Sequence, residues 1–379
     1  MTGETPRPET GKSETARPAL VGRRPVLVTG GAGFIGSNLA DRLAREGDDV
    51  LVYDALARPG VESNLAWLKS RHPQKVSSVV ADVRDEGGVA EAARDASAVF
   101  HFAAQVAVTT SLVEPRDDFA INVQGTLNLL ESLRRRADPV PLLFASTNKV
   151  YGDLADVPLD ETNDAYVPRD PKVRATGIGE DRPLDFHTPY GCSKGAADQY
   201  VLDYARSFDV PTAVMRMSCI YGPRQMGTED QGWVAHFLIR ALEDKPISIY
   251  GDGRQVRDVL NVADAVEAYL SAWRRIETVQ GRAFNLGGGP ANAVSLRQLL
   301  AYMEDFLGRP VDLTFSDWRA GDQRYYVSDT RRAARELELR PPIPWRTGVA
   351  ALARWLADER GLEGPAPRAA ARAQVEALS

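Results

Sequence analysis

A tyrosine and a lysine four residues apart, Tyr190 and Lys194, have a spacing that suggests catalysis. On a helix that begins near Pro189, positions four apart lie on one face, so the two side chains would be neighbours. A lysine ammonium beside a phenol stabilises the phenolate and lowers the tyrosine pKa from about 10 toward neutral pH. Such a phenolate can take a proton from a substrate hydroxyl, and Thr147, at the end of an expected strand, can hydrogen-bond the same oxygen. The three residues predict redox chemistry on an alcohol, although a Tyr–Lys pair at this spacing is also common on helix surfaces.

A glycine-rich turn near the start of the chain predicts a dinucleotide site. An apolar run at residues 26–29 leads into the turn from Gly30 to Gly36, which fits GxxGxxG from Gly30 and GxGxxG from Gly31. Glycines let the backbone approach a pyrophosphate, and the next helix presents free N–H groups to it. Asp54 follows at the end of the second expected strand, where a carboxylate binds the adenosine ribose and repels a 2′-phosphate. The pattern therefore predicts NAD rather than NADP.

Residues after the third and fourth expected strands complete the predicted cofactor site. Asp82 and Val83 are placed to meet the adenine, and the small residues Ala103 and Ala104 let the chain pass close to the dinucleotide. The alternative for these positions is a polar turn or tight packing. The residues expected to bind NAD are Gly30, Gly33, Phe34, Ile35, Gly36, Asp54, Asp82, Val83, Ala103, Ala104, Tyr190 and Lys194.

Apolar strands alternate with amphipathic helices from residue 25, which is typical of an α/β fold with a Rossmann-type, doubly wound parallel sheet. Strands are expected at residues 26–29, 50–53, 76–80, 98–102, 141–146 and 212–217, and the clearest helices at 34–45, 117–136 and 193–207. After residue 217, shorter elements rich in Gly and Pro predict a smaller C-terminal lobe that binds substrate. We expect tails at residues 1–22 and 362–379, an NAD-binding domain at 23–217, and a substrate lobe at 218–361 with helices that return to the first domain.

The composition argues against several other functions. A net charge of -6 with mixed signs along the chain disfavours nucleic acid as a partner. The apolar runs are too short for a bilayer and the N-terminus has no signal-peptide core, so we expect a cytoplasmic protein without membrane association. The two cysteines, Cys192 and Cys219, are not spaced as CxxC, so neither a disulfide framework nor a metal site is expected.

Four segments together resemble the extended short-chain dehydrogenase/reductase family of NAD-dependent epimerases and dehydratases. They are the glycine-rich turn and residues 145–152, 189–194 and 256–258. This resemblance implies a nucleotide-sugar enzyme with Thr147, Tyr190 and Lys194 as its catalytic residues. Residues 146–154, 184–200 and 230–234 resemble, more narrowly, the 2-epimerases of CDP-sugars of the paratose and tyvelose type. The narrower resemblance implies oxidation at C2 to a transient keto-sugar and hydride return to the opposite face.

The resemblance also bears on rival functions. Sugar dehydratases of this family carry Asp-Glu directly after the catalytic Thr, whereas this chain has Asn148 and Lys149, neither of which is a carboxyl acid or base. Dehydration therefore lacks its machinery. A 4-epimerase of UDP- or CDP-sugars stays open, because the same three catalytic residues serve it. A protein of another class, an NAD-binding regulator without turnover, is disfavoured by the intact Tyr190 and Lys194.

A nucleotide sugar, with CDP favoured, is the expected partner. Arg257 and Arg324 lie in regions where the family contacts the diphosphate, although each could be an ordinary surface residue. Cys219 stands where many relatives have an asparagine. The long connection at residues 152–189 is expected to form a lid over the sugar. We expect a homo-oligomer, either a dimer or a tetramer. The residues expected to bind the substrate are Gln105, Ser111, Asn148, His187, Arg224, Gln225, Gln231, Arg257 and Arg324.

Overall fold

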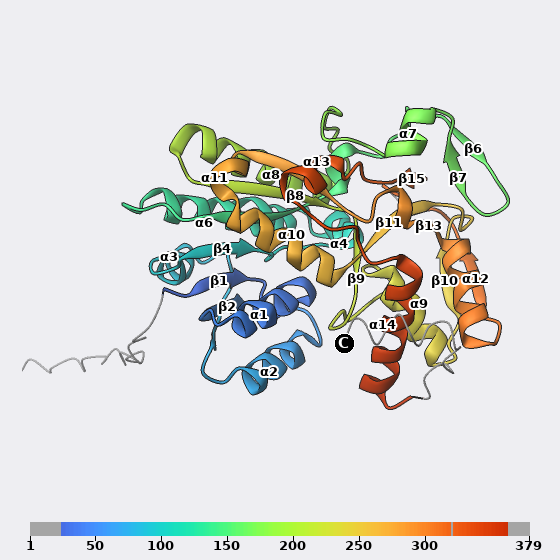
Figure 1. Cartoon of the computed structure of the whole chain (residues 1–379), viewed down its shortest axis with the longest axis horizontal. Coiled ribbons are helices and arrows are strands. Elements are labelled where there is room, and N and C mark those ends of the chain that lie inside the picture. The colour runs from blue at the N-terminus through green and yellow to red at the C-terminus, as the bar shows by residue number, and fades with distance from the viewer. Residues whose placement is uncertain (1–23, 320, 363–379) are drawn as a thin grey trace, which may run out of the picture.

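The structure is a computed structural model that describes residues 24–319 and 321–362. The expected N-terminal tail, and all but the first residue of the expected C-terminal tail, lie outside the described residues. Two parts are visible in Figure 1: a sheet with helices on both faces, and a smaller lobe built around α9, α12 and α14. None of the helices in the two described ranges is both long and apolar enough to cross a membrane.

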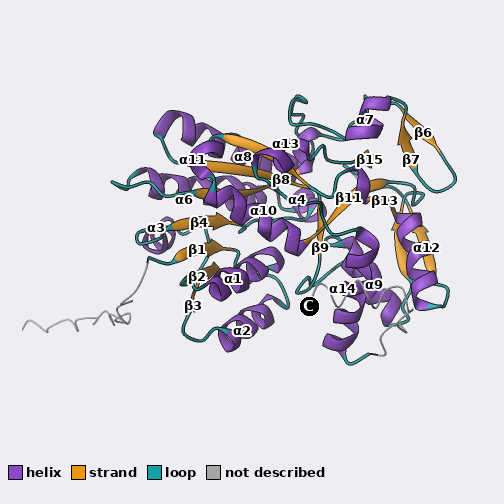
Figure 2. Ribbon diagram, viewed as in Figure 1, coloured by secondary structure: helices purple, strands orange, loops and turns teal. Residues whose placement is uncertain are grey.

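The larger part is built on a parallel sheet of seven strands in the order β12-β8-β5-β4-β1-β2-β3. Strands β1, β4 and β5 are buried along their whole length, because helices cover both faces of the sheet (Figure 2). The strand order reverses between β1 and β4, which opens a crevice at the carboxyl ends of the strands. The strands are β1 (Val26–Thr29), β2 (Val50–Asp54), β3 (Val76–Val80), β4 (Ala98–His101), β5 (Leu142–Thr147), β8 (Thr212–Met217) and β12 (Arg282–Leu286).

Two groups of helices bury the two faces of this sheet. On one face α1 (Phe34–Glu46), α2 (Val61–Arg71) and α10 (Val262–Arg274) share a core that includes Leu39 and Tyr269. On the other face are α3 (Glu86–Ala93), α6 (Gly125–Arg134) and α8 (Thr188–Phe208), which contribute Leu129 and Val201 to a second core. This arrangement confirms the predicted doubly wound α/β fold.

The smaller lobe has its own hydrophobic core. Side chains such as Val234, Leu299 and Leu352 pack together in it. Strand β11 is its centre, pairing with β9, β13 and β15, while β10 pairs with β14. The elements of the lobe are β9 (Cys219–Tyr221), α9 (Trp233–Leu242), β10 (Ile247–Tyr250), β11 (Val256–Asn261), β13 (Ala293–Ser295), α12 (Leu296–Leu307), β14 (Leu313–Ser316), β15 (Tyr325–Tyr326) and α14 (Trp345–Arg360).

Two features of the sheet domain were not predicted from the sequence. Strand β12 returns from the C-terminal half of the chain and pairs with β8 at the edge of the sheet. The helical stretch expected at residues 117–136 is divided into α5 (Pro115–Phe119), a π-helical turn at Ala120–Gln124 and α6. The remaining short elements are α4 (Val108–Val113), a 3-10 turn at Asn148–Tyr151, β6 (Leu159–Glu161), β7 (Tyr166–Pro168), α7 (Pro171–Thr176), α11 (Ile276–Val279), a 3-10 turn at Pro290–Asn292 and α13 (Arg331–Glu336).

Candidate active site

A cavity of about 670 Å³ lies at the carboxyl ends of the sheet strands and extends to residues of the smaller lobe. Its lining comes from the turns after β1 to β5 and β8, from the start of α8, and from the loops and strands of the lobe. The predicted catalytic residues all line it, and so do most of the predicted cofactor residues. Those lining residues are Gly30, Gly33, Phe34, Ile35, Asp54, Asp82, Val83, Ala103, Ala104, Thr147, Tyr190 and Lys194.

The glycine turn has the close backbone packing that a dinucleotide site requires. Gly30 has φ +68°, and a Cβ added there would lie 2.6 Å from the backbone nitrogen of Ala103. A Cβ added at Gly36 would lie 2.3 Å from the carbonyl oxygen of Gly30, so Gly36 shapes the turn without lining the cavity. Helix α1 begins after Gly33 without a side-chain cap, which leaves its first N–H groups available to an anion. These residues fit the pyrophosphate of NAD.

The carboxylate predicted to bind the ribose is held in place by backbone donors. Asp54 accepts hydrogen bonds from the N–H groups of Ala32 (2.9 Å) and Leu56 (2.9 Å), and each oxygen keeps a lone pair for a ribose hydroxyl. Arg84, a cavity residue that the sequence analysis did not single out, forms a 2.7 Å ion pair with Asp82 and lowers the pKa of that carboxyl. The guanidinium is therefore already paired with a carboxylate. The arrangement fits a 2′-hydroxyl, as the sequence predicted.

The catalytic side chains are almost completely buried and approach the cavity from two elements. Strand β5 ends at Thr147, whose Oγ1 accepts a hydrogen bond from the N–H of Lys149 (3.3 Å) and caps the 3-10 turn. Helix α8 begins at Thr188 with Pro189 in its first turn, where the missing proline N–H costs nothing. This places Tyr190 and Lys194 on successive turns of one face, only 9% and 3% exposed.

Burial shifts the pKa values of the catalytic pair in opposite directions. It raises the pKa of Tyr190 to about 12, although a hydrogen bond with Thr147 acts to lower it. It lowers the pKa of Lys194 to about 7. The Lys194 ammonium lies over the ring of Phe144, with Nζ 4.1 Å from the ring centroid. Both shifts have one cause, since burial disfavours the charged form of each group.

Five of the predicted substrate-binding residues line the cavity: Asn148, Arg224, Gln225, Gln231 and Arg257. Arg257 is 8% exposed and donates to the carbonyl of Val256 (2.8 Å), so its guanidinium is fixed before any substrate binds. Gln225 donates its amide N–H to the carbonyl of Ile220 (3.1 Å), which leaves its buried Oε1 without a partner among the described residues. That oxygen can accept a hydrogen bond from a ligand.

Two further predicted contacts, Gln105 and Ser111, do not line the cavity. The Gln105 amide bonds Asp118 (2.9 Å) and the carbonyl of Ala107 (2.9 Å). Ser111 accepts a hydrogen bond from the backbone N–H of Tyr190 (3.2 Å) and therefore fixes the start of α8. Both side chains are thus committed to protein partners beneath the site.

His187 and Arg324 are also absent from the lining. His187 lies beside Asp185, with Nε2 3.0 Å from a carboxylate oxygen. The Arg324 guanidinium lies 5.5 Å and 5.6 Å from the ring centroids of Tyr166 and Trp318, outside the cavity. The side chain is long and exposed, and two aromatic faces attract its cation away from the crevice.

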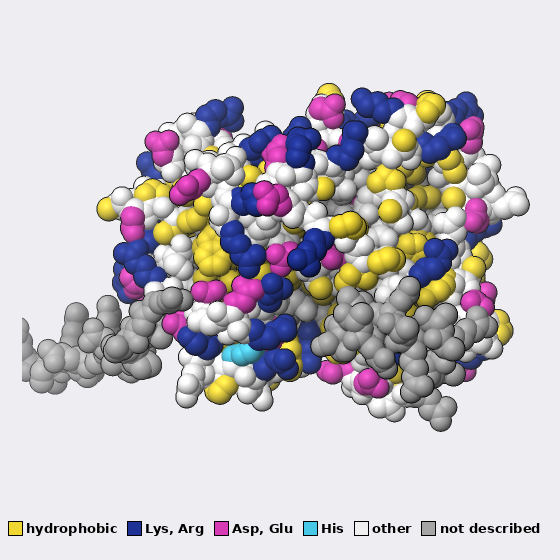
Figure 3. All heavy atoms as spheres, viewed as in Figure 1, with side chains coloured by type: hydrophobic (Ala, Val, Ile, Leu, Met, Phe, Trp, Pro, Cys, Tyr) yellow, Lys and Arg dark blue, Asp and Glu magenta, His cyan; other side chains and the backbone are white. Residues whose placement is uncertain are grey.

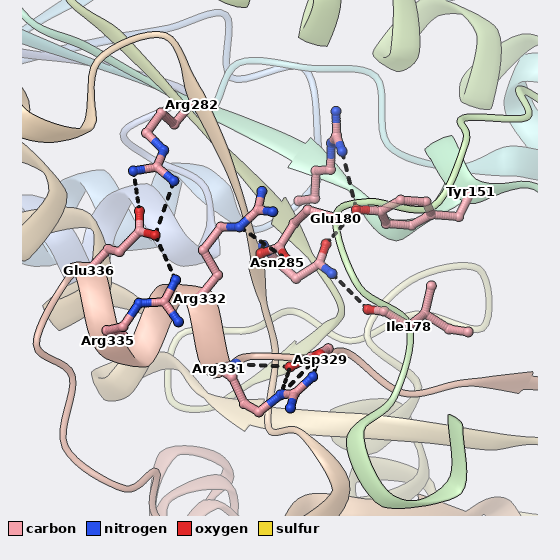
Figure 4. Close-up of polar contacts among 11 residues, drawn as sticks. Tyr151, Ile178, Glu180, Arg282, Asn285, Asp329, Arg331, Arg332, Arg335 and Glu336 are labelled. Atoms are coloured by element: carbon pink, nitrogen blue, oxygen red, sulfur yellow. Dashed lines mark hydrogen bonds and ion pairs between the residues drawn. The ribbon is translucent and has the colours of Figure 1, made fainter. Parts of the chain in front are cut away.

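The expectation that residues 152–189 form a lid is wrong for this structure, because none of them lines the cavity. The connection is anchored on β12 and α13 instead (Figure 4). The amide of Asn285 accepts from the Tyr151 hydroxyl (2.7 Å) and donates to the carbonyl of Ile178 (2.8 Å). The Glu180 carboxylate accepts from the backbone N–H of Asn285 (2.8 Å) and lies 3.7 Å from Arg332.

Lys149 is a cavity residue that the sequence analysis used only to argue against dehydration. Its Nζ donates to the carbonyl of Gly321 (2.8 Å), which joins the end of β5 to the smaller lobe. Burial and the nearby Arg257 cation lower the pKa of Lys149 to about 8. Its position two residues after Thr147 was the signal that could have identified it. Arg58 and Arg319 also line the cavity, but no motif marks them.

Several known proteins are similar to this chain in sequence and in fold. A model of the NAD dependent epimerase/dehydratase family matches residues 26–287. CDP-paratose 2-epimerase of Salmonella typhi is 42% identical over 337 residues, which cover 87% of this chain and 98% of that protein. UDP-glucose 4-epimerase of Thermotoga maritima, solved with UDP-glucose, has a TM-score of 0.76 at 28% identity, covering 89% of this chain and 99% of that one.

A further solved structure bears on the cofactor. UDP-glucose 4-epimerase of Thermus thermophilus, solved with NAD, has a TM-score of 0.73 at 30% identity and covers 88% of this chain and 98% of its own. The predicted NAD cofactor is thus confirmed. With this fold, this cofactor site and a family match over more than half of its length, the chain belongs to the NAD dependent epimerase/dehydratase family, within the extended short-chain dehydrogenases/reductases.

Proposed function

We propose that the protein inverts C2 of a CDP-sugar of the paratose and tyvelose type. The observation that carries this proposal is the 42% identity to a CDP-paratose 2-epimerase along 98% of that enzyme. The solved 4-epimerases share only 28% and 30% of their residues with this chain at similar coverage. The 2-epimerases and 4-epimerases use the same three catalytic residues. The proposal therefore rests on the similarity of the sequence around those residues.

The residues at the cavity support a redox route to inversion. NAD, when bound, supplies the hydride acceptor and a positive charge close to the sugar. Tyr190 would take the proton of the C2 hydroxyl as the carbon is oxidised, with Thr147 donating a hydrogen bond to the same region. The Lys194 ammonium would stabilise the phenolate. After the keto-sugar has turned over in the cavity, the hydride would return to the opposite face of C2 and Tyr190 would return the proton to the C2 oxygen, which gives the inverted alcohol.

The two residues after Thr147 favour epimerisation over elimination of water. The Asn148 amide donates to Gln323 (3.3 Å), and Lys149 donates to the backbone of Gly321. Neither side chain can act as the carboxyl acid or base that a dehydration needs. Arg257 and Gln225 are both buried and line the cavity. We propose that Arg257 binds the diphosphate and that Gln225 accepts a hydrogen bond from a donor group of the sugar or the base.

We also propose that the protein is a homodimer. Helices α4 and α5 pack against α8, and together the three expose the apolar side chains of Leu112, Val113, Phe119 and Tyr200. Contiguous exposed apolar side chains on a folded domain mark an interaction site. A two-fold axis through this surface would bury it against its copy.

An NMR assay with a panel of nucleotide sugars tests the proposed reaction. The protein is incubated with CDP-, UDP- and GDP-sugars in ordinary and deuterated water, and the inverted carbon is located in each product. We expect inversion at C2 of a CDP-sugar without uptake of solvent deuterium. Inversion at C4 would establish the 4-epimerase alternative, and bound NAD without any turnover would establish a regulator.

A further inference from the structure

A buried carboxylate, Asp118, lies outside the cavity but beneath the catalytic helix. It belongs to α5, is 0% exposed and lies two residues before the π-helical turn at Ala120–Gln124. A π-helical turn is uncommon and often occurs beside a functional site. Sequence periodicity gave no indication of this carboxylate.

Three side chains from separate parts of the chain hold the Asp118 carboxylate. The hydroxyl of Ser193, between Tyr190 and Lys194 on α8, donates to Oδ2. The amides of Gln105 (2.9 Å) and Asn122 (3.3 Å) donate to Oδ1. Asn122 also donates to Ser193 Oγ (3.0 Å) and receives a hydrogen bond from the backbone N–H of Gln105 (2.9 Å). The network is closed, and it fixes the carboxylate against the catalytic turn of α8.

Asp118 has no arginine, lysine or histidine nitrogen within 4.0 Å among the residues that the structure describes. A buried carboxylate with neutral donors alone is costly unless a charge lies near it. Burial raises the pKa of Asp118, while the hydrogen bonds from Ser193 and Gln105 and the Lys194 cation act to lower it. In return, Asp118 favours the charged form of Lys194 and disfavours the phenolate of Tyr190.

The other groups that face Lys194 are accounted for by partners of their own. Asp198 on α8 also favours the charged form of Lys194, but it forms a buried ion pair with Arg216 (2.9 Å). His101 on β4 is neutral, since burial lowers its pKa to about 3. Phe144 on β5 contributes only its ring face. Of the two carboxylates that act on Lys194, Asp118 is therefore the one without an ion-pair partner among the described residues.

We propose that Asp118 is a positioning residue for the Tyr190–Lys194 pair. Its carboxylate, fixed by Ser193, Gln105 and Asn122, adds to that of Asp198 the negative charge that favours the ammonium form of Lys194 beneath the cavity. The inference rests on the proposed redox role of the pair. It adds a residue that touches neither substrate nor cofactor yet sets the charge state of both catalytic groups.

The sign of the effect follows from electrostatics. Removing a negative charge makes proton loss easier at every nearby group, so both apparent pKa values of the coupled pair fall together. The active form carries a phenolate at Tyr190 and an ammonium at Lys194. The two limbs of the pH profile of kcat/KM therefore report these two apparent pKa values. The whole bell-shaped profile should therefore move to lower pH. A residue with only a structural role would lower the activity without moving both limbs.

The test uses Asp118→Asn, which keeps the size and loses the charge, and Asp118→Ser as a second variant. The pH profile of kcat/KM is measured for the NAD-loaded enzyme with its CDP-sugar substrate. We expect both limbs to move down by about half a unit to one unit. The control is Asp203→Asn, which removes an exposed charge from the catalytic helix α8 and should leave the profile unchanged.

A spectroscopic titration separates this inference from the proposed function. The absorbance of tyrosinate in the NAD-loaded protein is measured against pH, and the same titration of Tyr190→Phe is subtracted to isolate Tyr190. This measurement needs no substrate. We expect phenolate formation to be complete at lower pH in Asp118→Asn than in the wild type. An unmoved titration and an unmoved profile would overturn the proposal, and so would variants that no longer fold and bind NAD. A wild type with no turnover but a shifted titration would overturn the proposed reaction alone.

Discussion

Tyr190 and Lys194 show how one physical effect prepares two groups differently. Burial opposes charge on both, so Tyr190 holds its proton more tightly and Lys194 less tightly than in water. The pair is therefore poised to be neutral until charges around it change. The Asp198 and Asp118 carboxylates favour the charged form of Lys194, and bound NAD would bring a positive charge that favours the phenolate of Tyr190.

Replacing the base tests its role at the scale of one atom. Tyr190→Phe removes only the hydroxyl, so we expect NAD binding to be retained and kcat to fall by about 10²–10⁴-fold. NAD content is measured by absorbance and turnover by NMR. Tyr200→Phe makes the same change at an exposed position of α8 and should leave turnover intact. Wild-type turnover in Tyr190→Phe would refute the base assignment.

We expect Lys194 to lower the free energy of unfolding of the protein. Its folded pKa of about 7 lies below the 10.5 of a lysine in water, so between these pH values the folded state binds fewer protons than the unfolded state. Wild-type stability should therefore rise with pH across this window. We expect Lys194→Met to be inactive but more stable by about 1–2 kcal/mol at or below pH 7, since loss of the attraction to Asp118 offsets part of the gain.

Urea unfolding of the NAD-free proteins at several pH values measures this difference. The advantage of Lys194→Met should shrink as the pH rises from about 7 toward 10.5. An advantage that grows with pH, or a variant less stable than the wild type at pH 6, would contradict the assignment of a buried ammonium.

At the scale of elements, the site is made by the ends of β5 and α8 and by the connection between them. That connection turns away from the cavity, because Asn285 on β12 binds Tyr151 at its start and Ile178 near its end. Figure 4 shows Asn285 between these two partners. The connection thus braces the turn after Thr147.

Truncating Asn285 tests this brace. Asn285→Ala removes the acceptor of the buried Tyr151 hydroxyl and one of the two donors to the Ile178 carbonyl, which keeps its hydrogen bond from the N–H of Asp329 (2.9 Å). We therefore expect the free energy of unfolding to fall by about 1–3 kcal/mol. The change is measured by urea unfolding, and faster hydrogen exchange should appear around residues 176–182. Asn163→Ala, on an exposed part of the same connection, should change stability little. Equal stabilities of the two variants would disprove the anchoring role.

Local patterns in the sequence predicted the elements that bear motifs better than the contacts between distant segments. The strand, turn and helix around Gly30 follow from a short apolar run and its glycines, and the start of α8 follows from Pro189. Strand β12 was missed because its partner, β8, lies far earlier in the chain. The lid was wrong and Asp118 was missed for the same reason, since side chains remote in sequence decide both.

At the scale of the whole molecule, charge and apolar surface predict different things. Lys and Arg side chains are interspersed with Asp and Glu over the face seen in Figure 3, which fits the modest net charge of -6. The exposed apolar side chains of α4, α5 and α8 are flanked by exposed charged residues, Arg116 and Asp117 among them. The exposure of four large apolar side chains on helices that pack together supports the proposed dimer.

A charged substitution in this surface tests the dimer. Val113→Glu, at a side chain 74% exposed on α4, should shift the molar mass measured by light scattering from two chains to one. Val80→Glu places the same charge on a valine 60% exposed on β3, and should leave the mass unchanged. Identical masses for both variants and the wild type would exclude this surface as the interface.

The central claim, a redox inversion at C2 of a CDP-sugar, is tested most directly with a CDP-sugar that carries deuterium at C2. NMR of the product in ordinary water reports both the inverted centre and the fate of the label. We expect inversion at C2 with the deuterium retained there, because the hydride that leaves C2 is the one that returns to it. Loss of the label to solvent, or inversion at a carbon other than C2, would disprove the proposed redox inversion.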